Sequence, residues 1–194
     1  MPMLATYEEI DNLTPAELRF RQACQFYVLF KEHHGPSVDP LDTRLFWMCY
    51  ADAFLMTLVS LKDLVSPDQK KALNGSDLFR MMTVLRNVTV HQAVVSKGSP
   101  LNMIVRDIYL GGRPWRYENA MLGAVRITEA LDHYEQKLKQ ENRWDRERRN
   151  VEGARRWNAG LAAQATPRVE LWQVFLEALT FVAGVCGFTL PTGL

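Results

Sequence analysis

The chain has 194 residues, of which 47% are hydrophobic and 23% are charged, which is the composition of an ordinary globular protein with its own core. Its 23 basic and 22 acidic residues give a formal net charge of +1, so overall charge provides no attraction to nucleic acids or membranes. Acidic residues at Glu8, Glu9 and Asp11 exclude the basic and apolar pattern of a secretory signal, and we expect a cytoplasmic protein.

The three cysteines, Cys24, Cys49 and Cys186, lie far apart in the chain. An odd number without close spacing argues against a disulfide framework and against a zinc site. Since apolar residues surround each of them, we expect all three to pack as small hydrophobic side chains. The sequence predicts neither a metal site nor a cofactor.

Cap signals and apolar periodicity predict long helices. Thr14, Pro15 and Glu17 are typical of a helix N-terminus, because Thr and Glu can satisfy each other's backbone amides there. Similar reasoning along the chain predicts helices over about residues 15–32, 40–65, 67–74, 77–97, 101–110 and 115–139. No stretch alternates clearly with a period of two, so we expect no strand and an all-α fold.

The C-terminal part differs in composition, and we divide the chain into a helical bundle over residues 1–142 and an extension over residues 143–194. The extension begins with an arginine-rich segment, in which Arg143, Arg146 and Arg149 could bind an RNA backbone. A mixed, ion-paired helix surface is the simpler interpretation of this segment.

Residues 158–166 are rich in Ala and Gly and predict a linker. Thr166-Pro167 then predicts the cap of a last helix, which we expect to pack on the bundle or on a partner. Its apolar run is short for a membrane span, and Gln173 and Glu177 are costly in lipid, so we expect no membrane partner. Basic residues before it keep a membrane-tethered helical protein as an alternative.

The helix expected over residues 77–97 carries an unusual polar stripe. It is apolar nearly all round, which predicts burial. Four polar residues nevertheless share one stripe, with Arg86 beside it: Arg80, Thr83, Asn87 and His91. Burying such groups raises the free energy of the folded state unless they form hydrogen bonds or ion pairs with protein or water. They therefore either satisfy one another in the core or line a cleft or subunit interface.

The motif Arg86-Asn87-x-x-x-His91 resembles the signature of the HEPN domain (higher eukaryotes and prokaryotes nucleotide-binding), which is an Arg, a polar residue directly after it, and a His five to seven positions past the Arg. The resemblance implies a bundle of four or five helices in which the motif follows two long antiparallel helices. Many members are metal-independent ribonucleases of toxin–antitoxin and other defence systems. They act as dimers that bring two motifs together.

The resemblance implies RNA as substrate, a homodimer, and a nucleotidyltransferase-type antitoxin or another defence partner. His91 would act as general base or acid, Arg86 would stabilise charge on the phosphate, and Asn87 would orient His91 or hold the ribose. Arg80 and Thr83 would support the site, and Asp52 on the preceding helix would hold Arg86 or form an exposed ion pair.

Two alternatives stay open. The first is a bundle of the same kind without catalysis, which binds nucleotide, RNA or a protein. The second concerns the motif, because Arg126 and His133 repeat the Arg-to-His spacing. An apolar residue follows Arg126, however, and we expect that pair to lie on the surface near Glu129.

Overall fold

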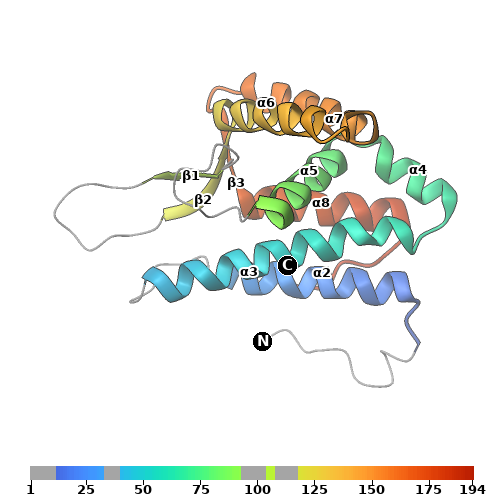
Figure 1. Cartoon of the computed structure of the whole chain (residues 1–194). Coiled ribbons are helices and arrows are strands. Elements are labelled where there is room, and N and C mark those ends of the chain that lie inside the picture. The colour runs from blue at the N-terminus through green and yellow to red at the C-terminus, as the bar shows by residue number, and fades with distance from the viewer. Residues whose placement is uncertain (1–11, 33–39, 93–103, 108–117) are drawn as a thin grey trace.

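The computed structural model describes residues 12–32, 40–92, 104–107 and 118–194, with the backbone alone for residues 40–48, 89–92, 104–107 and 118–120. The described part is mostly helical (Figure 1). The elements in chain order are α2 (Pro15–Glu32), α3 (Pro40–Ser60), η1 (Leu61–Asp63), α4 (Pro67–Gly75), α5 (Asp77–Gln92), β1 (Ile104–Asp107), β2 (Glu118–Gly123), α6 (Ala124–Gln140), α7 (Trp144–Ala162), β3 (Arg168–Glu170) and α8 (Leu171–Cys186).

Side-chain caps fix the N-termini of the early helices. At α2, Thr14 Oγ1 accepts from the Glu17 amide at 3.2 Å, and the Glu17 carboxylate accepts from the Thr14 amide at 2.8 Å. Ser66 and Gln69 form the same reciprocal box at α4. At α5, Ser76 Oγ accepts from the Phe79 amide at 3.3 Å. The predicted starts of these helices are confirmed.

The helices stack in three layers (Figure 1). Helices α2 and α3 lie side by side, α5 and α8 form the middle layer, and α6 and α7 cover the other side of α5. Phe175 of α8 joins the first two layers, with its ring 5.2 Å from Phe30 of α2 and 4.2 Å from Phe54 of α3. The hydrophobic core therefore runs from α2 to α8 without interruption.

A small antiparallel sheet of order β1-β2-β3 corrects the expectation of no strand. Ile104 pairs with Leu122, and Leu122 pairs with Val169. These strands are short, and pairing with distant segments rather than local alternation specifies them. β2 leads directly into α6, and β3 leads directly into α8, so the sheet sets where both helices begin.

Several helix boundaries differ from those predicted. Residues 104–107 form β1 rather than part of a helix over 101–110, and β2 replaces the first part of the helix expected over 115–139. The other residues of 101–114 lie outside the described part of the chain. The linker expected over 158–166 is wrong at its start, because α7 continues to Ala162. Glu170, rather than Thr166, occupies the N-cap position of the last helix.

Helix α8 packs on α2, α4 and α5, which confirms that the last helix lies on the bundle. The expected boundary after residue 142 coincides with the turn between α6 and α7, where Asn142 has a φ of 56°. Helices on both sides of this turn contribute to one core. Among the helices in the described ranges, none combines the length and apolar character needed to cross a bilayer.

Candidate functional site

Helix α5 carries the motif and lies between α3 and α7. Its apolar side chains, including Met81, Met82 and Val88, are buried, as the sequence predicts. Two residues of its polar stripe are also buried, since Thr83 and Asn87 are each 3% exposed, whereas Arg80 is half-buried. Helix α7 of the same chain covers Asn87 and the stem of Arg80, at a place where the sequence also allows a subunit interface.

Arg86 and Asn87 form the centre of the candidate site. The Oδ1 atom of Asn87 accepts from Arg86 Nε at 3.1 Å and from Arg86 Nη2 at 2.7 Å. The Nδ2 atom of Asn87 donates to Glu147 Oε2 of α7 at 3.1 Å. Both ends of the Asn87 amide are therefore engaged, and Asn87 holds the half-buried Arg86.

Glu147 is the site residue that the sequence analysis missed. It is 8% exposed, and its Oε2 also accepts from Asn150 Nδ2 at 3.0 Å. The exposed Arg146 lies 4.0 Å from Oε1. The available signal was the buried face of α7, on which Glu147, Val151 and Ala154 recur at helical spacing. A carboxylate within such a stripe needs a polar partner, and Asn87 provides it.

Two titratable groups from other elements face this network. Burial and then the charge of Arg86 lower the pKa of Lys62 in η1, while Asp63 and Glu147 oppose the shift. Burial and then the charge of Glu147 raise the pKa of Tyr134 in α6. The Tyr134 hydroxyl lies close to the Asn87 side chain but makes no hydrogen bond of good geometry within the described structure. The site is thus a junction of η1, α5, α6 and α7.

Arg80 serves the packing of α5. Its Nε donates to the Asn74 carbonyl of α4 at 2.7 Å, and its Nη1 lies 3.5 Å from Asp77. Its stem packs directly on Gly153 of α7. Thr83 Oγ1 donates to the Phe79 carbonyl one turn earlier at 3.0 Å. Neither residue joins the hydrogen bonds between Arg86, Asn87 and Glu147.

His91 belongs to α5 and follows Asn87 by four residues, which is about one helical turn. Its side chain lies outside the described residues. Asp52 is half-buried on α3, a helix that packs against α5. The competing pair lies where the sequence predicts, since Arg126 contacts Glu129 at 3.0 Å on the surface of α6 and His133 is exposed.

Ion pairs occupy much of the arginine-rich segment, which forms α7 and the turn before it. Arg143 pairs with Glu141 at 3.0 Å, and Arg148 pairs with Glu152 at 2.7 Å. Arg155 and Arg156 bind carboxylates of α6 and α5. These contacts confirm the mixed helix surface. Arg146 and Arg149 are exposed, and the side chain of Arg146 is 84% exposed.

The cysteines follow the prediction in part. Cys24 is buried and Cys186 is half-buried, but Cys49 is exposed on α3. In the part of the chain that the structure describes, no three His, Cys, Asp or Glu side chains are grouped closely enough to hold a metal ion.

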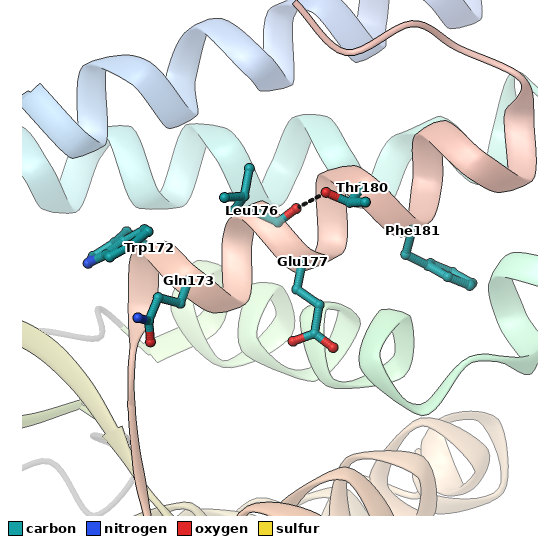
Figure 2. Close-up of a pocket in the computed structure, with 6 residues that line it drawn as sticks. All are labelled: Trp172, Gln173, Leu176, Glu177, Thr180 and Phe181. Atoms are coloured by element: carbon teal, nitrogen blue, oxygen red, sulfur yellow. Dashed lines mark hydrogen bonds between the residues drawn. The ribbon is translucent and has the colours of Figure 1, made fainter. Parts of the chain in front are cut away.

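A hollow lies along one side of α8 (Figure 2). Its described lining residues all belong to α8: Trp172, Gln173, Leu176, Glu177, Thr180 and Phe181. Thr180 Oγ1 donates to the Leu176 carbonyl at 2.9 Å, so its hydroxyl has a hydrogen-bond partner within the helix. Glu177 is the charged residue among the described lining residues.

The chain matches no protein-family model, no curated protein and no solved structure.

Proposed function

We propose that the protein is a metal-independent endoribonuclease of the HEPN type. The observation that carries the proposal is the pair of hydrogen bonds that fixes the Arg86 guanidinium on Asn87, one helical turn before His91. A permanent cation held in one orientation can stabilise a phosphorane-like transition state, because it needs no reorganisation as charge develops. A histidine titrates near neutral pH and can move the protons of the reaction.

The proposed reaction uses the nucleophile that RNA carries. The 2′-hydroxyl loses its proton to His91, its oxygen forms a bond to phosphorus, and the bond from phosphorus to the 5′-oxygen breaks. The leaving 5′-oxygen takes a proton from an acid, for which we propose His91 of a second copy. The products are a 2′,3′-cyclic phosphate and a 5′-hydroxyl.

We propose a homodimer in which two copies of the motif meet. Since α7 covers Asn87 and the stem of Arg80 within the chain, the copies would meet through the C-terminal end of α5. Light scattering at tens of micromolar tests this directly. A strictly monomeric species would contradict the dimer and would leave the acid unassigned.

The proposed biological role is that of a cytoplasmic toxin or defence effector with a nucleotidyltransferase-type antitoxin. Arg146 and Arg149, exposed on α7, would contact the RNA backbone. Arg143 would contribute less, because Glu141 already binds it. Co-expression with the neighbouring gene products tests the role, since an antitoxin should relieve growth arrest.

The second candidate is a bundle of the same kind without catalysis. It is favoured by the partners at both ends of the Asn87 amide, which binds Arg86 and Glu147 as a core network would. In this case the motif stabilises the helix junction, and the protein acts by binding nucleotide, RNA or another protein.

One experiment separates the two candidates. Wild-type protein, His91→Ala and Arg86→Lys are incubated with single-stranded and hairpin RNA in EDTA, and melting temperatures are measured on the same samples. For the enzyme, His91→Ala should lose about 10²–10⁴-fold in rate. Arg86→Lys keeps the charge but loses the planar fork, so its rate should also fall. Wild-type protein that is inert on this panel would favour the non-catalytic bundle.

A further inference from the structure

We infer that Glu147 of α7 is a positioning residue, which orients Arg86 through the Asn87 amide and makes α7 part of the ribonuclease site. This inference rests on the proposed function for its effect on cleavage. The orientation of Arg86 itself can be measured without any activity.

Glu147 sets the direction of the Asn87 amide. An amide can present either its oxygen or its nitrogen to a neighbour, but an ionised carboxylate only accepts hydrogen bonds. Glu147 Oε2 therefore draws the Nδ2 of Asn87 toward itself, at 3.1 Å. Asn87 Oδ1 is left facing the opposite way, where Arg86 Nε and Nη2 donate to it. The charge of Glu147 thus reinforces the orientation of the amide in which Arg86 meets an acceptor and not a donor.

A second amide holds Glu147 in place. Asn150 follows it by three residues on α7 and donates to the same Oε2 at 3.0 Å. Glu147 and Asn87 are 8% and 3% exposed, while Arg86 is half-buried. The hydrogen bonds therefore run from Glu147, a buried carboxylate that accepts two of them, through Asn87 to the half-buried guanidinium of Arg86. Burial strengthens such bonds and limits other conformations of their members.

The orientation of Arg86 has a direct consequence for the reaction. A phosphate-stabilising cation acts by being in place before charge develops, and a displacement of about 1 Å can cost about 10²-fold in rate. Loss of the Glu147 charge should free the Asn87 amide to rotate and let Arg86 take other orientations. Turnover should then suffer more than RNA affinity, which depends mostly on charge that Arg86 retains.

The test compares Glu147→Gln with wild-type protein. The substitution keeps size and an acceptor oxygen but removes the charge. Arg156→Gln is the matched control, because Arg156 also joins α7 to α5, through Asp77 at 2.8 Å, away from the site. We expect Glu147→Gln to lower kcat by about 10- to 100-fold with KM nearly unchanged. Arg156→Gln should leave kcat at the wild-type value.

A double variant tests the route through Asn87. If Glu147 acts only through that amide, Asn87→Ala combined with Glu147→Gln should be no slower than Asn87→Ala alone. Multiplied losses would overturn the inference, as would a normal kcat in a stable Glu147→Gln protein.

An activity-free readout separates this inference from the proposed function. The Nε–H signal of Arg86 in ¹H–¹⁵N spectra, assigned by its absence in Arg86→Lys, should be sharp in wild-type protein because Asn87 accepts from it. It should broaden or shift in Glu147→Gln and persist in Arg156→Gln. An unchanged Arg86 signal in Glu147→Gln would refute the positioning role. Inert wild-type protein with a changed signal would refute only the ribonuclease.

Discussion

Cys24 of α2 makes the stability of the protein sensitive to alkaline pH. The side chain is 3% exposed, and burial raises the pKa of the thiol from 9.0 to about 12. Above pH 9 the unfolded chain loses this proton while the folded protein keeps it. The protonated Cys24 thiol therefore contributes fully to the free energy of unfolding below pH 9. As pH rises from 9 toward 12, the free energy of unfolding falls by about 1.4 kcal/mol per pH unit.

Urea unfolding at pH 8, 9 and 10 measures this effect. Burial also raises the pKa of Tyr27 and Tyr134, which acts in the same direction above pH 10, whereas the lowered pKa of Lys62 acts in the opposite direction. Comparing variants isolates the thiol. Cys24→Ala should flatten the loss between pH 9 and 10, and the exposed Cys49→Ala should not. Equal slopes in all three proteins would contradict the prediction.

Individual residues of the site were predictable to different degrees. Arg86 and Asn87 are neighbours in sequence, and their polarity within an apolar helix is enough to mark them as candidates. Glu147 lies 60 residues from Asn87 in the sequence. No local sequence pattern predicts which helix packs against α5, so this pairing could not be predicted. The role of Asn87 also depends on this partner, because the carboxylate fixes which atom of the amide faces Arg86.

At the scale of elements, the junction of α5 and α7 depends on a residue without a side chain. A Cβ at Gly153 would overlap the Cδ of Arg80 and lie 2.9 Å from its Cβ. Gly153→Ala should therefore lower the free energy of unfolding by about 1–3 kcal/mol. This reverses the gain of about 1 kcal/mol that Gly to Ala usually gives inside a helix.

Gly160 is the matched control for Gly153. It lies on the same helix with open space around the position of a Cβ, so Gly160→Ala should stabilise the protein. Thermal or urea unfolding of the two variants gives the comparison. A stabilising Gly153→Ala would show that the helices can separate without cost.

The exposed arginines of α7 give a prediction for RNA binding. Each cation that contacts a phosphate of single-stranded RNA contributes about 0.7 to the slope of log affinity against log salt. In a His91→Ala background, Arg146→Gln and Arg149→Gln should each reduce the slope by about this amount. Arg148→Gln, whose guanidinium binds Glu152 at 2.7 Å, should change it less. If Arg146→Gln and Arg149→Gln keep the salt slope of the His91→Ala parent, α7 is not part of the RNA interface.

Helices were more predictable than strands, for physical reasons. The caps at Thr14 and Ser66 act within four residues, so the sequence alone specifies them. β3 has three residues, and Val169 is in a strand because it pairs with Leu122. Pairing of this kind is decided by the tertiary structure, and the segment before α6 was therefore mistaken for helix.

At the scale of the whole molecule, α8 completes the core. Phe175 is fully buried between the rings of Phe30 and Phe54. Phe175→Ala should lower the free energy of unfolding by about 3–5 kcal/mol, because it leaves a cavity where three helices meet. Phe181→Ala on the same helix (Figure 2) should cost less, because Phe181 is half-buried and packs at the edge of the core.

Chemical denaturation of the two phenylalanine variants checks this prediction. Similar losses for both would mean that α8 contributes to stability mainly by covering surface. The bundle over residues 1–142 and its extension would then be less dependent on each other than the shared core indicates.

The late position of α8 has a consequence for synthesis. Helices α2 and α3 leave the ribosome before α8, and Phe175, which packs against the rings of Phe30 and Phe54, is made more than a hundred residues after them. Until then the nascent chain exposes the aromatic surface that α8 will cover, and it is a natural client for chaperones. A ribosome that stalls before α8 emerges would hold a chain with an incomplete core.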